Sequence, residues 1–268
     1  MRKFALITGA SRGIGLAFAE LLARQGYDLL LVARSQDQLL SVKKRLQNSF
    51  NVEVVIFLVD LSLPSSPQEL VNFIDNNKIE IGMVINNAAF GYNGKYSNLA
   101  WEQEIKMINL NIVSSVYITK YFLNKMLKSN SGSIINVIST VAFAPGPYMS
   151  SYSASKAYML SYTESLAEEI KGSEVKLMAL CPGPTRTNFH YQSGINFSEA
   201  ELNQMPTAEQ VAVYAYSLLR KNQVVVIHGW ANKILVISLR FLPRNLIKSV
   251  LSIIRMKRLN LSCRKRQK

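Results

Sequence analysis

Cysteine and histidine are scarce in this 268-residue chain, which has two residues of each. Cys181 and Cys263 make no disulfide framework, so we expect two ordinary thiols in a reducing compartment. His190 and His228 stand far apart in the sequence, without the spacing of a metal site. Gly-x-Ser-x-Gly, the nucleophile-elbow pattern of a Ser–His hydrolase, occurs once, at Gly9–Gly13, and this match belongs to the glycine-rich turn discussed below. The sequence therefore predicts no metal site and argues against hydrolytic chemistry.

Long apolar runs are absent as well. No run reaches the ~18 residues that a membrane-spanning helix needs, and no signal peptide precedes the first strand-like segment. We therefore expect a cytoplasmic protein, in which the sequons at Asn196 and Asn260 have no meaning. A chain of about 250 residues is often one α/β domain.

Acidic residues are missing from the C-terminal part of the chain. The net charge is +14, and the segment from Arg220 to Lys268 contains thirteen Lys and Arg but no Asp or Glu. The other 219 residues carry eighteen bases and seventeen acids. The body is therefore nearly neutral, and the tail is strongly basic.

Short apolar segments rich in β-forming residues alternate with helical patterns along the chain. They lie at 4–8, 29–33, 52–59, 83–86, 133–138, 175–180 and 224–227. Strands that alternate with helices predict a parallel sheet covered on both faces. We predict one doubly wound, Rossmann-type α/β domain over residues 1–228 and a basic helical tail over 229–268. Ser35 and Gln38 are predicted to form a capping box at one helix start.

A glycine-rich turn follows the first predicted strand and precedes a helical pattern, the context of a dinucleotide fingerprint. Gly9 permits the tight turn, Gly13 lets the backbone approach a pyrophosphate, and Gly15 lets the helix pack closely. The start of the helix supplies free N–H groups and a partial positive charge. The predicted phosphate-binding residues are Gly9, Ser11, Arg12, Gly13, Ile14 and Gly15. A glycine turn without a ligand is the weaker interpretation.

Tyr152 and Lys156 stand four residues apart, so they share one face of a helix. An ammonium beside a phenol favours the phenolate, so we expect the pKa of Tyr152 to fall from about 10 toward neutrality. Such a phenol exchanges a proton with an alcohol or carbonyl oxygen. Ser139, which follows the strand-like segment 133–138, could offer a hydroxyl to the same oxygen.

Together these motifs resemble the short-chain dehydrogenase/reductase family from about residue 3 to residue 227. The resemblance rests on the glycine spacing G-x-x-x-G-x-G, on Asn86-Asn87-Ala88-Ala89, and on Ser139, Tyr152 and Lys156. The segment 139–147 is similar to that of a bacterial subgroup of short-chain dehydrogenases. The chain departs from the family at Ala89, where a glycine is usual, so small adjustments near the nicotinamide ribose are expected.

The resemblance implies further site residues. Asn111 corresponds to the family's fourth catalytic residue, which holds a water of the proton relay, with Asn109 as a register competitor. The resemblance also implies that Lys156 binds the nicotinamide ribose. The remaining residues implied to contact the cofactor are Asp60, Asn87, Ala88, Tyr152, Pro182, Gly183 and Thr187. For Asp60 a simple turn role is nearly as good an interpretation, and either asparagine could instead bond its own helix backbone.

The residues after the second predicted strand favour NADP(H) over NAD. An enzyme that binds NAD usually has an acid about 20 residues after the glycine turn, but Ala33-Arg34 occupies that place. An arginine can grip a 2′-phosphate with two hydrogen bonds, and Arg12 adds a second cation. Asp37 is the competing acid, although a first-turn dipole role explains it. Alternatively, both arginines are solvated surface charges that do not bind the 2′-phosphate.

These observations predict an NADP(H)-dependent oxidoreductase that interconverts a carbonyl and a secondary alcohol. The alternative is a non-catalytic NADP(H)-binding sensor or scaffold docked to a membrane by the tail. The segment 181–206, the longest without clear periodicity, is predicted to be the substrate loop. Aromatic residues in the expected loops suggest an apolar substrate, or merely pack the loops; they are Phe90, Tyr92, Phe143, Tyr148, Phe189, Tyr191 and Phe197, with Met149. The resemblance implies a homodimer or homotetramer through the helices around Asn111 and Tyr152.

The basic tail contains an amphipathic helical pattern after Pro243. Leu246, Ile247, Val250, Leu251 and Ile254 recur at helical spacing with basic residues between them. Such a helix can lie peripherally on an anionic membrane, here the inner face. Equally, its apolar stripe could pack on the protein body or a second subunit. Nucleic-acid binding is not expected, because aromatic residues for stacking are nearly absent after Phe241.

Overall fold

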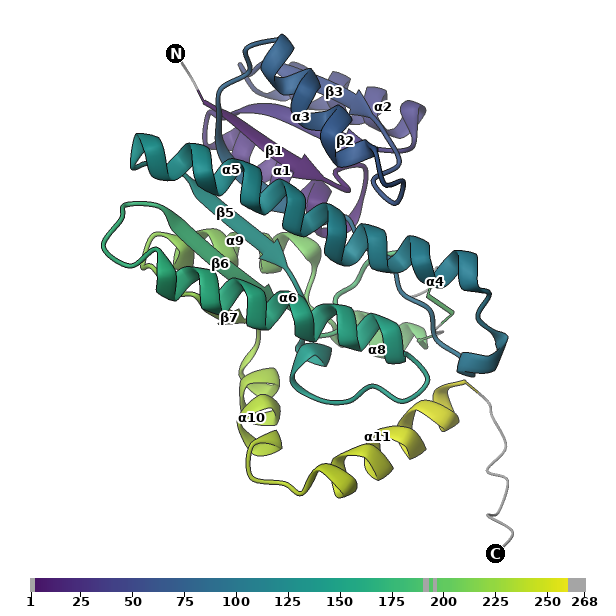
Figure 1. Ribbon diagram of the computed structural model, residues 1–268. Helices are drawn as coiled ribbons and strands as arrows, with labels where there is room; N and C mark the ends of the chain where they lie inside the picture. Colours follow the sequence, from purple (N-terminus) through teal and green to yellow (C-terminus); the bar gives the residue numbers. More distant parts are fainter. Residues whose placement is uncertain (1–2, 190–192, 195–196, 260–268) are drawn as a thin grey trace, which may run out of the picture.

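The computed structural model describes residues 3–189, 193–194 and 197–259. Within them, seven parallel strands form one sheet in the order β3-β2-β1-β4-β5-β6-β7 (Figure 1). The strands are β1 Phe4–Thr8, β2 Asp28–Ala33, β3 Val54–Leu58, β4 Ile81–Asn86, β5 Ser133–Val137, β6 Lys176–Cys181 and β7 Val225–Ile227. The seven predicted segments match these strands to within two residues at each end, so the predicted doubly wound fold is confirmed.

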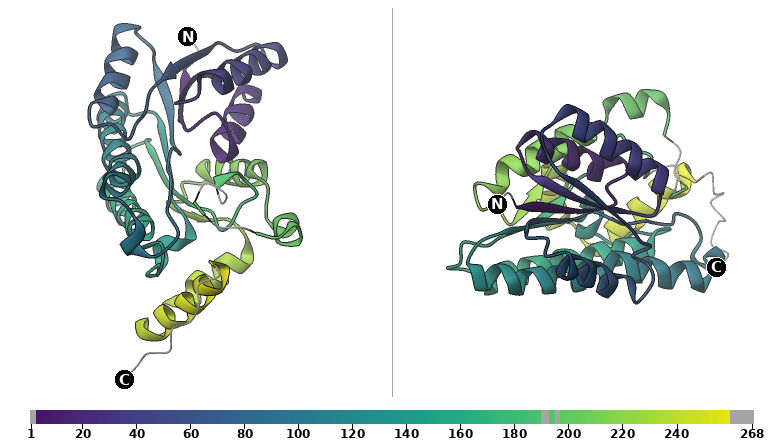
Figure 2. Two further views of the ribbon diagram at one scale, coloured as in Figure 1. Left: turned by 90° about the vertical axis from the view of Figure 1, so that its right-hand side faces the viewer. Right: turned by 90° about the horizontal axis from the view of Figure 1, so that it is seen from above.

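Helices cover both faces of the sheet (Figures 1 and 2). One face carries α1 Gly13–Arg24, α2 Gln36–Ser49 and α9 Ala208–Leu219, and the other carries α3 Ser66–Asn76, α5 Ser115–Ser129 and α6 Ser150–Glu169. The alternation of side chains along a strand explains the two layers. In β1, Ile7 packs in the same core as Phe18 of α1, whereas Leu6 packs with Phe122 of α5.

The chain order of the strands fixes the position of a cleft. After β1 the chain builds β2 and β3 on one side and then crosses to β4 on the other side of β1. Ligands of open α/β sheets bind at such a switch point, outside the carboxyl ends of the strands. The turns after β1, β4 and β5 and the loop after β6 therefore meet at one end of the sheet.

One long helical stretch crosses the molecule in three parts. α4 spans Trp101–Ile108 and continues through a π-helical turn, Asn109–Ser114, into α5. Such turns are rare and frequently mark functional sites. Asn111 lies in this turn.

The segment after β6 also contains the short helix α8 Glu199–Gln204. Two real capping boxes occur in this region: Ser198 with Glu201 before α8, and Thr207 with Gln210 before α9. The predicted box at Ser35 is wrong, because that residue precedes α2 but its side chain makes no cap hydrogen bond. Ser35 instead borders the cleft at the carboxyl ends of the strands.

The basic tail forms two helices, α10 Trp230–Leu239 and α11 Arg244–Arg258, and α11 begins directly after Pro243 as predicted. They leave the sheet after β7 and lie beneath it in Figure 1. Among the described residues, no helix combines the length and apolarity that crossing a membrane requires. His190, Tyr191, Cys263 and the sequon residues Asn196 and Asn260 lie outside the described residues.

Candidate active site

A cleft of about 900 Å³ opens at the carboxyl ends of the strands. It lies within the size range of small-molecule and cofactor sites. The structure brings to it all but two of the predicted site residues. Those that line it are Gly9, Ser11, Arg12, Gly13, Ile14, Arg34, Asp60, Asn87, Ala88, Ser139, Tyr152, Lys156, Pro182, Gly183 and Thr187. The two that do not are Gly15 and Asn111.

The glycine turn is closed by contacts from the loop after β4. Asn87 Nδ2 donates to the carbonyl oxygens of Thr8 (3.0 Å) and Gly9 (3.2 Å), and Thr8 Oγ1 accepts from the backbone N–H groups of Asn87 and Ala88 (both 3.0 Å). A Cβ on Gly15 would overlap the Gly9 carbonyl oxygen and lie 2.6 Å from Asn87 Nδ2. Gly15 therefore acts behind the cleft by letting α1 pack against the turn.

The start of α1 faces the cleft with its backbone. Gly9 and Gly13 have φ values of +66° and +57°, a conformation that glycine adopts readily. Arg12 precedes α1 in extended backbone, and no side chain of the described residues caps that start. The first N–H groups of a helix attract anions. The turn therefore fits the pyrophosphate of a dinucleotide.

Tyr152 and Lys156 lie near the start of α6 and are buried, with 7% and 4% of their surface exposed. Lys156 Nζ donates to the Val137 carbonyl at 2.9 Å and lies 5.7 Å from the centre of the Tyr152 ring. The hydroxyl of Ser139, which begins the turn after β5, hydrogen-bonds Tyr152 and accepts from Val141 N–H at 3.3 Å. The three predicted catalytic groups thus share one wall of the cleft.

The pKa of Tyr152 does not follow the direction predicted from the spacing to Lys156. Burial raises it above the usual value, and this effect outweighs the opposing hydrogen bond with Ser139 and the positive charge of Arg255. Burial also lowers the pKa of Lys156 to about 8. The reason is desolvation, which disfavours the charged form of both groups. At neutral pH the phenol is protonated and can donate.

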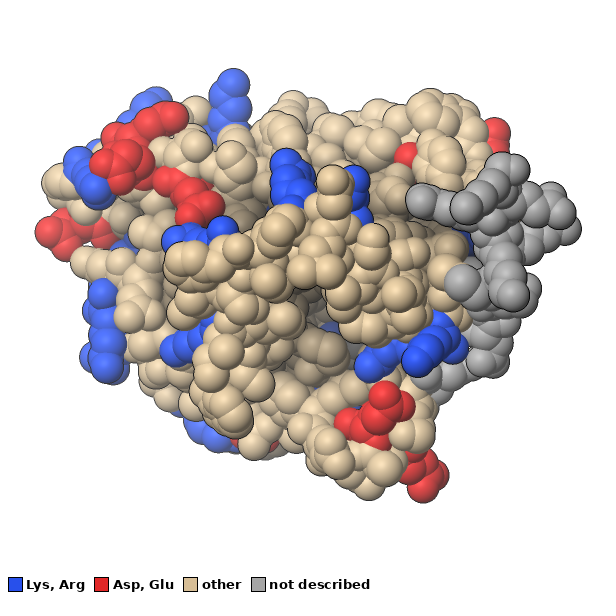
Figure 3. All heavy atoms as spheres, turned by 90° about the horizontal axis from the view of Figure 1, so that it is seen from below, with Lys and Arg blue, Asp and Glu red and all other residues tan. Residues whose placement is uncertain are grey.

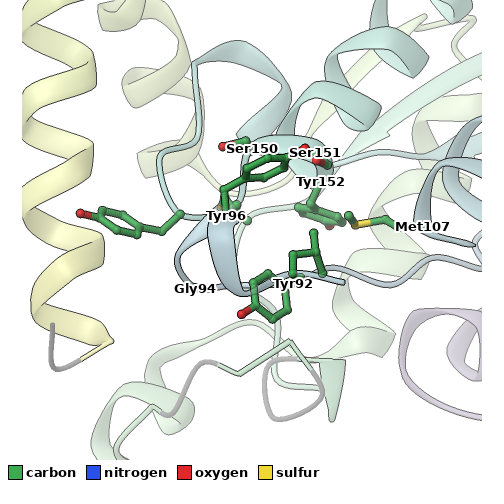
Figure 4. Close-up of a pocket in the computed structure, with 10 residues that line it drawn as sticks. Tyr92, Gly94, Tyr96, Met107, Ser150, Ser151 and Tyr152 are labelled. Carbon is green, nitrogen blue, oxygen red and sulfur yellow. The ribbon is translucent and has the colours of Figure 1, made fainter. Parts of the chain in front are cut away.

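The Tyr152 ring is fixed from several sides. A Cβ on Gly91 would lie 2.9 Å from the ring, so only glycine lets the loop after β4 approach this closely. The Phe189 ring lies 5.6 Å away, centre to centre. A small pocket of about 10 Å³, room for one water, also borders Tyr152, with Met107 beside it (Figure 4). These contacts hold the phenol in one orientation.

Asn111 lies behind the wall of the cleft, 2% exposed. Its side chain exchanges two hydrogen bonds with the backbone of Phe90, 3.2 Å and 3.0 Å long, and donates to Ser155 Oγ at 3.1 Å. Ser155 in turn donates to the Tyr152 carbonyl. The competing Asn109 instead donates to the Ser62 carbonyl. Of the two asparagines, Asn111 is therefore the one that joins the loop after β4 to α6.

Arg34 and Asp60 meet at the other end of the cleft, 3.6 Å apart. Partial burial favours a higher pKa for Asp60, but hydrogen bonds from Ser62 and the charge of Arg34 outweigh it and lower that pKa. Asp60 thus holds the more exposed Arg34 at the cleft edge. Asp37, the competing acid, is exposed at the start of α2 and does not line the cleft.

The segment after β6 and the tail complete the cleft. Thr187 lies against Gly13, and Asn232 of α10 packs tightly on Gly183. The tail contributes Leu235, Leu239, Leu251, Ile254, Arg255 and Arg258 to the lining. From the sequence, Leu251 and Ile254 are predicted to lie on the apolar stripe of the tail, but none of these six residues is assigned to the cleft. The helical spacing of the last four was visible, but nothing in the sequence says which surface that face meets.

Comparison with known proteins decides the family. A family model described as short chain dehydrogenase matches residues 3–195, more than half of the chain. The chain belongs to the short-chain dehydrogenase/reductase family. The resemblance predicted from the motifs is therefore confirmed, and this short-chain dehydrogenase/reductase is an oxidoreductase.

Individual relatives cover nearly the whole of the chain. A 7beta-hydroxysteroid dehydrogenase of Mediterraneibacter gnavus is 28% identical over 233 residues, which span 86% of this chain and 88% of the relative. The structure of a short-chain dehydrogenase from Sphingobium yanoikuyae in complex with NADPH has a TM-score of 0.79 and 28% identity, covering 99% and 98% of the two chains. A Burkholderia phymatum short-chain dehydrogenase/reductase in complex with NAD, at 24% identity and a TM-score of 0.77, covers 88% and 92% and shows the shared fold.

Proposed function

We propose that this chain is an NADP(H)-dependent oxidoreductase that interconverts a carbonyl group and a secondary alcohol on an apolar substrate. The observation that carries the proposal is the wall formed by Ser139, Tyr152 and Lys156 in the cleft that begins at the glycine turn. The relatives support it, since they include a hydroxysteroid dehydrogenase and a structure with NADPH.

The residues of the cleft fit a dinucleotide. The turn at Gly9 and Gly13 and the start of α1 would hold the pyrophosphate. Arg12 and Arg34 line the cleft near the end of β2 and would bind a 2′-phosphate. Lys156 would bind the ribose beside the nicotinamide, and Pro182, Gly183 and Thr187 would contact the carboxamide end. The nicotinamide supplies the hydride in reduction and accepts it in oxidation.

The side chains supply proton transfer and orientation. The protonated phenol of Tyr152 donates its proton to the substrate oxygen during reduction and takes it back in oxidation. Ser139 donates a hydrogen bond to the same oxygen and stabilises its developing negative charge. Asn111 positions Tyr152 through Ser155 and, by family resemblance, holds a water of the proton relay. The raised pKa of Tyr152 keeps the phenol protonated at neutral pH, which is the form that donates in reduction.

The test is turnover of a panel of apolar ketones, followed by the absorbance of NADPH. The Tyr152→Phe variant should lose about 10²- to 10⁴-fold in kcat, the usual contribution of a positioned acid–base group. Tyr158→Phe, an exposed tyrosine on the same helix, is the matched control and should keep full activity. Full activity of Tyr152→Phe contradicts the proton donor. Tight NADPH binding without turnover of any ketone or alcohol favours the sensor or scaffold alternative.

We further propose a homodimer or homotetramer through α4, α5 and α6. The outer side of this helical layer exposes Trp101, Val113, Leu127 and Tyr158, with 38% to 64% of each residue accessible. Light scattering after size exclusion measures the mass directly. A monomer at micromolar concentration contradicts the proposal, and Val113→Glu should weaken an assembly that uses this layer.

We also propose that the outer side of the tail docks on an anionic membrane. Trp230 and Phe241 are 77% and 82% exposed, and Ile234, Ile237, Leu246, Val250 and Ile253 are about half exposed. The tail carries bases and no acids, so two copies repel each other while an anionic surface attracts each base by roughly 1 kcal/mol. Figure 3, viewed from below, shows a mostly uncharged face with basic groups between and acidic groups toward its margins.

Vesicle flotation tests this docking. The wild type should float with phosphatidylglycerol-containing vesicles and not with phosphatidylcholine alone. The double variant Trp230→Ser, Phe241→Ser should lose flotation, whereas the double variant Leu40→Ser, Leu63→Ser, at two exposed apolar residues outside the tail and the proposed interface, should keep it. Equal flotation of the wild type and the double variant contradicts the proposal.

A further inference from the structure

The tail helices form part of the cleft wall. Arg255 Nη1 donates to Asn93 Oδ1 at 3.2 Å, in the loop after β4. Arg258 pairs with Glu201 at 3.6 Å, and its guanidinium lies 4.5 Å from the centre of the Phe197 ring. These contacts join α11 to the loop after β4 and to the segment after β6 that contains α8. The position of α11 is therefore set by the enzyme body.

The face that α11 turns to the cleft is mixed in character. Leu251, Ile254, Arg255 and Arg258 follow the i, i+3, i+4, i+7 spacing of one helix face, and all four line the cleft. Leu235 and Leu239 of α10 continue the apolar part. Two cations thus stand at the edge of an apolar wall.

Arg255 has no carboxylate partner among the described residues. Glu201 pairs with Arg258 instead, and the titratable groups that act on Arg255 are Arg258, which repels it, and the phenol of Tyr152. Burial and the charge of Arg258 lower the pKa of Arg255. Arg255 is partly buried, and taking a guanidinium out of water without an anion is costly. Asn93 uses one of its five N–H donors, so donors remain for a ligand.

Arg255 also acts on the part of the cleft that contains Tyr152. Its charge lowers the pKa of Tyr152, so the guanidinium and the phenol share one electrostatic environment. The predicted phosphate sites of the cofactor lie at the glycine turn and at Arg34, on the β1 and β2 side of the sheet. An anion held by Arg255 would therefore belong to the substrate.

We propose that Arg255, supported by Arg258, binds an anionic group on an otherwise apolar oxo substrate whose carbonyl lies at Tyr152. The substrate class is an amphipathic oxo compound with a carboxylate or a phosphate at some distance from the carbonyl. This inference rests on the proposed oxidoreductase function. An arginine fork binds either anion with two parallel hydrogen bonds.

The experiment compares charged and neutral forms of one skeleton. A series of apolar oxo carboxylic acids is assayed beside the matching methyl esters with NADPH. A phosphate arm compares oxoacyl-coenzyme A thioesters with neutral N-acetylcysteamine thioesters. The wild type should prefer the charged form in one arm, and the arm that shows the preference identifies the anion. Arg255→Gln should lower kcat/KM for the charged form about ten- to a hundred-fold, and change the neutral form by no more than about twofold.

Controls separate binding of the anion from folding and from the cofactor. Arg244→Gln removes an exposed base from the same helix and should change nothing. Arg255→Lys keeps the charge and should restore part of the preference. The Kd of NADPH should stay the same in all three variants. Equal loss for charged and neutral substrates, or a weaker Kd for NADPH in Arg255→Gln, overturns the proposal.

Direct titration distinguishes this proposal from the proposed function. Calorimetry of the oxo acid and its ester against the NADPH-saturated protein measures the charge preference without turnover. Tighter binding of the acid that disappears in Arg255→Gln supports the anion site, even if no reduction follows and the oxidoreductase proposal fails. Turnover without any charge preference overturns the anion site alone.

Discussion

The Gly15→Ala substitution tests how the glycine turn supports the cleft. The added Cβ would overlap the Gly9 carbonyl oxygen and lie 2.6 Å from Asn87 Nδ2 and 2.9 Å from the Gly9 carbonyl carbon. Favourable contacts begin near 3.5 Å, so α1 has to move on the order of 1 Å. Overpacking of this kind costs about 1–3 kcal/mol, or roughly 2–12 °C in Tm for a chain of this size.

The same displacement should damage ligand binding more than stability. Backbone N–H groups that shift by about 1 Å no longer point at the phosphates, and misplacement of this size can cost on the order of a hundredfold. Fluorescence titration should therefore show the Kd of NADPH rising at least tenfold. Thermal unfolding of the same sample measures the change in Tm.

Gly26→Ala is the matched control at the other end of α1. Its Cβ would meet nothing within 4 Å, but its φ is +81°, so the substitution costs backbone strain alone, about 1–2 kcal/mol. It should lower Tm and leave the Kd of NADPH unchanged. If Gly15→Ala binds NADPH as tightly as the wild type, the turn does not hold the cofactor as described here.

Three further predictions follow from the site. Arg34→Glu should weaken NADPH binding about ten- to a hundred-fold and leave NADH within about threefold; equal changes for both would refute the 2′-phosphate role. Burial lowers the pKa of Lys156 to about 8 from the ordinary 10.5, so the unfolded chain binds more protons between these values. The free energy of unfolding, measured by urea titration, should therefore rise between about pH 8 and about pH 9.5 in the wild type relative to Lys156→Met. Parallel pH dependence in the two proteins would refute the lowered pKa of Lys156. Asn111→Ala should lower the free energy of unfolding by about 1–3 kcal/mol and reduce kcat. Asn109→Ala loses one hydrogen bond and should lower the free energy of unfolding by less, as measured by urea titration. The reverse order would assign the family's fourth catalytic position to Asn109.

Much of the fold could be predicted from the sequence, because strands buried on both faces leave continuous apolar segments. The segment 175–180 and β6 differ by one residue at each end. Predictions were less dependable for residues whose side chains can make more than one local interaction. Ser35 has the right sequence for a capping box, but its side chain does not cap α2. The π-helical turn at Asn111 was also not predicted, because its sequence keeps an ordinary helical pattern.

For the site, too, some features could be predicted from the sequence and others could not. Spacing and resemblance predicted which residues line the cleft, since strand ends and helix starts fix the positions of Gly13 and Tyr152. They did not predict the pKa of Tyr152, because desolvation depends on everything that surrounds the ring. The place of Arg255 was equally out of reach. It depends on how α11 packs against the body, and amphipathic spacing alone does not choose a partner.

The start of β1 and the end of α11 lie at opposite ends of the described structure, which guides how the protein should be handled. β1 begins at Phe4, at the end of the strands opposite the cleft, whereas the end of α11 reaches Glu201 beside the cleft. A fusion placed directly after α11 would stand beside Glu201 and the side chains that we propose to bind the substrate anion and the membrane. Purification and labelling should therefore use the amino end, where an added peptide meets neither surface.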